Sequence, residues 1–187
     1  MSEIISKLSH LEIKSKRPTL EELSIENTFP VSVVVENIRS LYNVGSIFRT
    51  SDGAFVEKLN LCGYTGAPPR KEIEKTALGS VESVNWEHNE NTLEVLKNYK
   101  TQGYKIVSLE HTDNSIPYTE ADYSFPMCLV LGNEVGGISE EIVSMSDMAI
   151  EIPMFGLKQS LNVSVAYGIL IYHLRMLYEN NKFLKNK

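Results

Sequence analysis

Five short apolar runs, separated by helical patterns, constrain the fold of this chain more than any other feature. The runs are VSVVVE (31–36), LNLCGY (59–64), YKIVSLE (104–110), MCLVLGN (127–133) and MAIEIP (148–153). Continuous apolar strands of this kind occur in parallel sheets, where both faces are covered. The helical patterns cover 43–54, 90–101, a short stretch from Ser139 and a long one from Asn162 to Tyr178. This alternation predicts an α/β fold with a mostly parallel sheet and helices on both faces.

The chain has 187 residues, which is enough to bury one substantial core. Its sequence contains no internal repeat, low-complexity segment or linker that suggests a second domain. We therefore expect a single domain over 1–187, with 1–30 as a helical N-terminal extension. Within this extension the apolar residues of 3–14 share one helical face, and Thr19 with Glu22 has the pattern of a capping box for a second short helix.

The charge balance bears on the kind of partner that the protein binds. Its formal net charge is −6, which argues against a general nucleic-acid binder but allows a local basic patch. Three basic clusters occur, and each is either a solvated face or a phosphate site. They are Lys14, Lys16 and Arg17; Arg70, Lys71 and Lys75; and Lys182, Lys185 and Lys187.

The two cysteines, Cys62 and Cys128, lie inside two of the apolar runs. This setting predicts small buried side chains in a reducing compartment, rather than a disulfide or a metal pair. The N-terminus mixes charges into its apolar residues, unlike a signal peptide, and no apolar run has membrane-spanning length. We expect a cytoplasmic protein without a membrane partner.

Ligands of such sheets bind beyond the carboxyl ends of the strands, so the segment ENIRSLYNVGSIFRT after the first run is informative. Asn43 and Gly45 open the predicted helix there, and Arg49 follows Gly45 by one turn. Because helical side chains lean toward the N-terminus, we expect Arg49 to lie over the gap that Gly45 leaves. A guanidinium beside the N–H groups of a helix start suits a phosphate. A plain surface arginine is the alternative.

The segment LGNEVGGIS after the fourth run places three glycines around Asn133 and Glu134. Glycines at this density indicate unusual backbone conformations or close approach to a ligand. The spacing matches neither a dinucleotide fingerprint nor a Walker loop. Glu134 suits a cationic partner, either a ligand or Arg49, and a simple turn is the alternative.

After the fifth run, the segment IPMFGLKQSLNVSVA carries Ser160 and Asn162 to the start of the long helix. The two side chains therefore either cap that helix or meet a ligand. Together the three strand ends form a polar constellation without the usual hydrolase motifs or a Cys/His cluster. Such a site suits group transfer from a reagent that is already activated.

These three segments resemble the motifs of the SpoU/TrmH family of RNA ribose 2′-O-methyltransferases, within the SPOUT superfamily. NVGSIFRT matches the first motif, LVLGNEVGGIS the second and IPMFGLKQSLNVSVA the third, while KTALGSVESV (75–84) is similar to the linking segment of the family. The resemblance runs from about Val31 to Leu177. All three motifs occur in the expected order, each at a predicted strand end.

The resemblance implies a C-terminal trefoil knot, a rare exception to the rule against knots. It implies a homodimer, an RNA substrate with tRNA favoured over rRNA, and no metal. S-adenosyl-L-methionine would lie in the knot, held around Leu109, Gly132, Ile152, Met154 and Leu161. The functional residues carried over are Asn43, Arg49, Glu134, Ser160 and Asn162, with Arg49 reaching a site built partly by the other subunit.

A guanidinium rarely gives up its proton, so we expect Arg49 to clamp the target phosphate and the developing oxyanion rather than act as a base. A phosphate oxygen or water would take the ribose proton. Asn43 and Glu134 would orient the guanidinium, and Ser160 with Asn162 would shape the site.

Two alternatives share the predicted knot and cofactor pocket: a base-methylating SPOUT enzyme and a non-catalytic RNA-binding module. The full polar set weighs against the module, and the missing glycine fingerprint disfavours a dinucleotide-dependent oxidoreductase. The dimer has separate support, because the long helix is apolar over more of its circumference than one core face needs. Its apolar positions include Val165, Ile169, Tyr172, Leu174, Met176 and Leu177.

Overall fold

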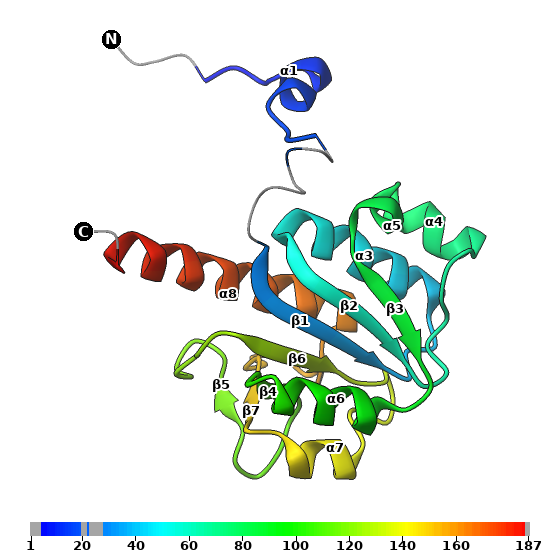
Figure 1. The fold of residues 1–187 in the computed structure, drawn as a ribbon, viewed down its shortest axis with the longest axis vertical. Helices are drawn as coiled ribbons and strands as arrows, with labels where there is room; N and C mark the ends of the chain where they lie inside the picture. Colours follow the sequence, from blue (N-terminus) through cyan, green and yellow to red (C-terminus); the bar gives the residue numbers. More distant parts are fainter. Residues whose placement is uncertain (1–4, 20–21, 23–27, 186–187) are drawn as a thin grey trace.

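The fold is built on a parallel sheet, as the apolar runs predict (Figure 1). The structure, a computed structural model, describes residues 5–19, 22 and 28–185. Within this part of the chain seven strands form one sheet in the order β3-β2-β1-β6-β4-β7-β5, and every pair of neighbours is parallel. The strands are β1 (Phe29–Glu36), β2 (Val56–Cys62), β3 (Trp86–Asn89), β4 (Lys105–Leu109), β5 (Ile116–Pro117), β6 (Met127–Leu131) and β7 (Met148–Glu151).

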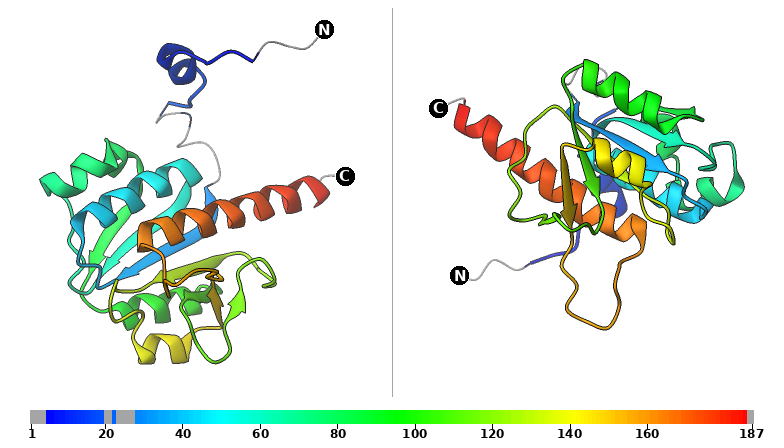
Figure 2. Two further views of the ribbon diagram at one scale, coloured as in Figure 1. Left: turned by 180° about the vertical axis from the view of Figure 1, so that it is seen from behind. Right: turned by 90° about the horizontal axis from the view of Figure 1, so that it is seen from below.

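Helices cover both faces of the sheet, which confirms the predicted α/β class (Figures 1 and 2). The helices of the described residues are α1 (His10–Ser15), α3 (Leu41–Ala54), α4 (Lys71–Ala77), α5 (Ser80–Ser83), α6 (Thr92–Thr101), α7 (Glu140–Met145) and α8 (Val163–Lys185), of which α1 stands apart from the sheet. Val33 of β1 belongs to the hydrophobic cluster with α3 and α8, and its neighbour Val34 belongs to the cluster with α6 and α7. Successive strand residues thus feed opposite cores, so an unbroken apolar run is needed.

The sequence analysis missed two strands and two helices. The four residues of β3 (WEHN) contain one apolar side chain, and β5 has only two residues. Both strands lie at the edges of the sheet, where pairing on one side does not demand a buried run. The helix α5 and the end of α4 fall on the segment 75–84, which was expected only as a linking segment.

The N-terminal extension differs from its prediction. The helix expected over 3–14 begins only at His10, because Ser9 and Glu12 form a capping box there, and residues 5–9 have no regular structure. No residue of α1 is buried. Residues 1–4 and most of the second expected helix (20–21 and 23–27) lie outside the described residues. The expected capping box of that helix is present. The Glu22 carboxylate accepts the backbone N–H of Thr19 at 2.7 Å, and the backbone N–H of Glu22 donates to the Thr19 hydroxyl at 3.2 Å.

No helix in the described part of the chain is long and apolar enough to span a membrane. Over the same residues, no group of three or more His, Cys, Asp or Glu side chains is placed to hold a metal ion.

Candidate active site

Strand register brings the three predicted segments to one edge of the sheet. Leu131 of β6 pairs with Val35 of β1 on one side and with Leu109 of β4 on the other, and Leu109 also pairs with Ile150 of β7. The strands are parallel and end nearly level, so their carboxyl-terminal loops must meet. The loops after β1, β4, β6 and β7 therefore share one site.

A cavity of about 430 Å³ lies among the loops after β4, β6 and β7 and the start of α8. Its volume falls within the usual range of about 300–1,000 Å³ for small-molecule sites. The structure brings together all five residues that were assigned to the cofactor. These are Leu109, Gly132, Ile152, Met154 and Leu161. Glu134, Ser160 and Asn162 also line the cavity, whereas Asn43 and Arg49 do not.

Asn133 fixes the conformation of the loop after β6. Its side-chain oxygen accepts the backbone N–H groups of Val135 and Gly136 at 2.9 and 2.8 Å, and its backbone exchanges two bonds of 3.0 Å with Gly137. A Cβ at position 132 would collide with the backbone of Gly137, so Gly132 is required by close approach of the two ends of this loop. The glycines predicted to carry unusual backbone thus build a tight hairpin that presents Glu134.

Glu134 is surrounded by donors from the chain itself. One oxygen accepts the backbone N–H of Arg39 at 3.0 Å, and the other accepts the N–H of Ser40 at 3.1 Å and the side-chain amide of Asn43 at 3.0 Å. Partial burial alone would raise the pKa of Glu134, but these donors outweigh it and hold the pKa below its ordinary value. Glu134 is therefore an anion at neutral pH and ties the loop after β1 to the loop after β6.

The chemistry of Glu134 fixes the direction of the next two amides. A carboxylate only accepts, so Asn43 must turn its NH₂ toward Glu134 and its oxygen away. Asn162 then donates its own NH₂ to that oxygen at 3.0 Å. This leaves the Asn162 oxygen to accept the N–H and hydroxyl of Ser164, at 2.9 and 2.7 Å, at the start of α8. Asn162 therefore caps α8, as one of its two predictions stated, and it also lines the cavity.

The arrangement of sheet, cavity and hydrogen-bonded chain agrees with the comparison with known families. The model of the SpoU rRNA Methylase family matches residues 30–172. The chain belongs to the SpoU family. This confirms the resemblance drawn from the three motifs, over nearly the same residues.

Two SpoU relatives are tRNA (guanosine(18)-2′-O)-methyltransferases. The protein from Aquifex aeolicus is 35% identical over 166 residues, 88% of this chain and 78% of that protein. The protein from Escherichia coli is 31% identical over 150 residues, 80% of this chain and 65% of that protein. The crystal structure of the A. aeolicus TrmH/SpoU tRNA modifying enzyme superposes with a TM-score of 0.79 over 92% of this chain and 86% of that one. The crystal structure of an AdoMet-bound rRNA methyltransferase from Sinorhizobium meliloti, which is 28% identical, superposes with a TM-score of 0.75. The superposition covers 82% of this chain and 59% of that one.

Arg49 does not lie where helix geometry predicted in this SpoU chain. The helix α3 begins at Leu41, with Ser40 as its N-cap, so Arg49 is more than two turns from the first residue of the helix. The gap at Gly45 is filled by α4, because a Cβ there would collide with the Ile73 carbonyl and with Thr76. Arg49 is exposed, and its side chain makes no hydrogen bond or ion pair with any described residue. The expected contact of Arg49 with Glu134 is therefore absent within one subunit.

The prediction missed three titratable residues of the cavity lining, namely Glu110, His111 and Glu151. Glu110 accepts the N–H of Ile138 at 2.8 Å and so braces the loop after β6. Glu151 accepts the hydroxyl of Ser115 at 2.6 Å and lies 3.3 Å from Nδ1 of His111, and these two contacts, Ser115 first, lower its pKa. The residues directly follow β4 or end β7, so the rule that ligands bind at strand ends would have found them.

Proposed function

We propose that this SpoU protein is an S-adenosyl-L-methionine-dependent RNA methyltransferase that modifies a ribose 2′-hydroxyl of tRNA. The observation that carries the proposal is the hydrogen-bonded chain Glu134–Asn43–Asn162 at the wall of the cavity. The names of the A. aeolicus and E. coli relatives support the reaction and the substrate class. The AdoMet-bound S. meliloti neighbour supports the methyl donor.

The cavity suits the methyl donor in shape and charge. Apolar side chains of Leu109, Ile152 and Met154 offer contact area for an adenine ring, and the lining carboxylates Glu110 and Glu151 favour a positively charged ligand. When bound, S-adenosyl-L-methionine supplies an activated methyl group on a sulfonium. The protein then has to position the acceptor, since the cofactor carries the difficult chemistry.

The chain's own residues would orient the ribose and stabilise its developing charge. Ser160 and Asn162 line the cavity and offer hydrogen bonds to a ribose hydroxyl. Glu134 is committed to N–H donors, so it acts as a brace for Asn43 and not as a base. A phosphate oxygen or water takes the proton. Arg49, permanently charged, clamps the target phosphate and the developing oxyanion.

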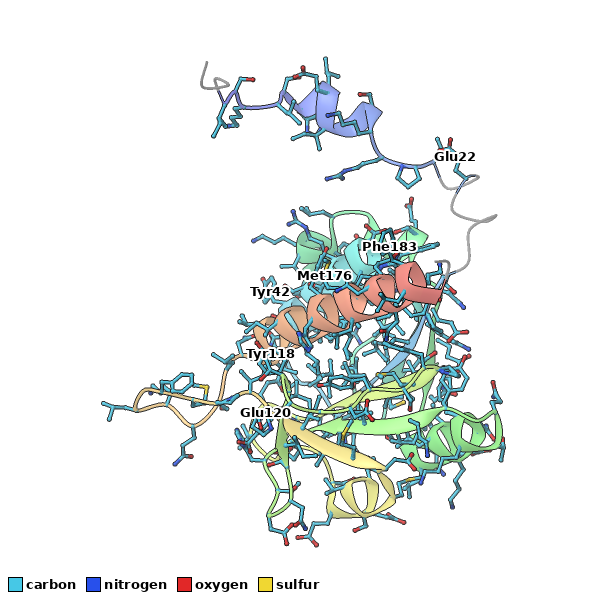
Figure 3. The ribbon with its side chains drawn as sticks, turned by 90° about the vertical axis from the view of Figure 1, so that its left-hand side faces the viewer. Glu22, Tyr42, Tyr118, Glu120, Met176 and Phe183 are labelled. Carbon is cyan, nitrogen blue, oxygen red and sulfur yellow. The ribbon has the colours of Figure 1, made fainter. Side chains whose placement is uncertain are left out.

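A second copy of the chain would bring Arg49 to the cavity. The helix α8 exposes apolar side chains along one face, with Val165 at 51%, Tyr172 at 50% and Met176 at 60% exposed, while Leu174 is buried in the core. Figure 3 shows Met176 along α8, which packs against α3. Arg49 lies on this same α3, away from its own cavity. We therefore propose a homodimer through α3 and α8.

The dimer is tested by Met176→Glu, which places a charge in the centre of the exposed stripe. We expect ultracentrifugation to find a dimer for the parent protein and a monomer for this variant, with an unchanged circular dichroism spectrum. A parent protein that is monomeric at micromolar concentration contradicts the arrangement.

The path of the chain between β7 and α8 supports the expected trefoil knot. The strand β7 pairs with β4, and the segment that follows it extends away from the sheet edge. The helix α8 then returns along the face of the sheet that carries α3 (Figure 2). We propose that this return is threaded through the loop that follows β4. A crystal structure with continuous density from residue 109 to 166 would test the threading.

The same proposal treats 1–187 as one domain with 1–30 as its extension, working in the cytoplasm. The two cysteines, Cys62 and Cys128, are buried free thiols, and burial raises the pKa of each, which suits a reducing compartment.

Incubation with labelled S-adenosyl-L-methionine and total RNA tests the reaction. We expect label in tRNA and, after mapping, a nucleotide methylated on the ribose 2′-oxygen. Label on a base would favour the base-methylating alternative instead. Tight RNA binding without any label would indicate a binding module.

A further inference from the structure

An exposed aromatic ring stands beside the catalytic edge on the loop after β2. Tyr64 is 61% exposed, yet both ends of the residue are fixed. Its hydroxyl accepts the side-chain amide of Asn133 at 3.0 Å, and its backbone N–H donates to the side-chain oxygen of Asn37 at 3.1 Å. Asn133 directly precedes Glu134. The ring is thus held open to solvent next to the hydrogen-bonded chain of the site.

The backbone under this ring is equally well fixed. The buried hydroxyl of Thr65 donates to the Val35 carbonyl at 2.9 Å and accepts the N–H of Ile38 at 3.0 Å, which joins the loop after β2 to the loop after β1. Asn37 and Gly63 adopt left-handed conformations with φ of +56° and +62° at the point of contact. An aromatic side chain on such a rigid base binds a planar ligand at little cost in conformational entropy.

Arg39 lies on the neighbouring loop. Its backbone N–H is held by Glu134 at 3.0 Å, and it follows the fully buried Ile38, so the position of its Cα is fixed at the site. Its side chain is exposed, and its guanidinium has no hydrogen bond or ion pair among the described residues. A free guanidinium is well suited to a phosphate. A chain with a net charge of −6 needs such local cations to hold RNA.

We propose that Arg39 and Tyr64 form a subsite for a single-stranded RNA segment next to the methylated nucleotide. Arg39 binds a phosphate of that segment, and the ring of Tyr64 stacks on an unpaired base. Aromatic stacking of splayed bases is the usual way in which proteins recognise RNA outside helices. The subsite deepens the proposed function and rests on it, because the target ribose must reach Ser160 and Asn162. The apolar stripe of α8, by contrast, suits a protein partner.

The test measures dissociation constants for a tRNA transcript at several salt concentrations. Tyr64→Leu should weaken binding about 5- to 150-fold, because loss of base stacking is worth about 1–3 kcal/mol. Tyr64→Phe keeps the ring and should bind within about twofold of the parent protein. Arg39→Gln should make the slope of log affinity against log salt shallower by about 0.7, the share of one phosphate contact to a single strand. Lys97→Gln, an exposed cation on α6, is the control and should leave the slope unchanged.

Four results would overturn the subsite. Binding by Tyr64→Leu that equals the parent's excludes stacking, and an equal loss in Tyr64→Phe assigns the effect to the hydroxyl bond with Asn133. An unchanged salt slope in Arg39→Gln removes the phosphate contact. Conversion of Tyr64→Leu to a monomer in ultracentrifugation assigns the ring to a protein interface. If the parent protein methylates no RNA while Tyr64→Leu still weakens RNA binding, the proposed reaction fails but the RNA contact of Tyr64 is retained.

Discussion

Glu134 and Arg49 are the two charged residues of the proposed catalytic set, and their surroundings in the protein are opposite. Glu134 accepts three hydrogen bonds from its own chain, all between 3.0 and 3.1 Å, whereas the guanidinium of Arg49 is exposed and without a partner among the described residues. An anion that is satisfied internally serves to hold structure. A cation left open is available to another molecule. Under the proposed mechanism, one subunit would contain a complete scaffold, and its Arg49 would act in the site of the partner.

Removing the guanidinium of Arg49 tests this contrast most strongly. Arg49→Ala should lower the methylation rate by about a hundredfold or more, because transition-state charge loses its stabilising donor. Arg49→Lys should also be poor, since an ammonium cannot replace a two-pronged donor. The affinity for S-adenosyl-L-methionine by calorimetry and the melting temperature should stay the same. Turnover at the parent rate would make Arg49 a surface charge.

Mixing two defective variants tests whether Arg49 of one subunit acts in the site of the other subunit. Neither Arg49→Ala nor Asn162→Ala alone should methylate efficiently. Random exchange of subunits places an intact Arg49 opposite an intact Asn162 in one of the two sites of each mixed dimer, so about a quarter of the parent activity should return. Activity after mixing that equals the mean of the two single variants would show that Arg49 works in its own subunit.

Two substitutions of Asn162 separate its role as the cap of α8 from its role in the proposed reaction. Asn162→Ala removes the cap of α8 and should cost about 1 kcal/mol, or a drop of about 2–4 °C in melting temperature. Asn162→Asp keeps an oxygen for Ser164 but cannot donate to Asn43, so stability should return while activity stays low. Calorimetry and initial rates measure the two effects. Full activity in Asn162→Asp would mean that its bond to Asn43 is not needed.

The smallest effect concerns pH. The hydrogen bonds to Glu134 hold its pKa below the ordinary 4.5, so its contribution to the free energy of unfolding is present above that pH and is lost as the pH falls through the lowered pKa. Glu134→Gln should be less stable at pH 7 by a modest amount, and the gap to the parent should narrow on acidification. Urea unfolding at pH 7 and pH 3 measures it. A gap that widens in acid would contradict the assignment.

The sequence predicts the parts of this molecule that depend on burial and strand order. The run VSVVVE reads directly as β1, and Glu134, Ser160 and Asn162 were found because strand ends converge. Polar edge strands such as β3 carry no comparable pattern. The donors around Glu134 escaped detection because two of them are backbone N–H groups, which every residue carries. Arg49 was misplaced because α4, packed against Gly45, follows from tertiary contacts and not from helix periodicity.

The chain of side chains in the site joins residues that are far apart in sequence. Asn43 is 91 residues from Glu134 and 119 from Asn162. Contacts of such long range form late in folding, since closing large loops costs entropy before any contact compensates for it. A nascent chain that ends before residue 162 lacks the last of these groups, however well β1 and α3 have formed. If these residues act together as proposed, catalytic competence comes only when almost the whole polypeptide has been synthesised and folded, and an incomplete chain would not modify RNA.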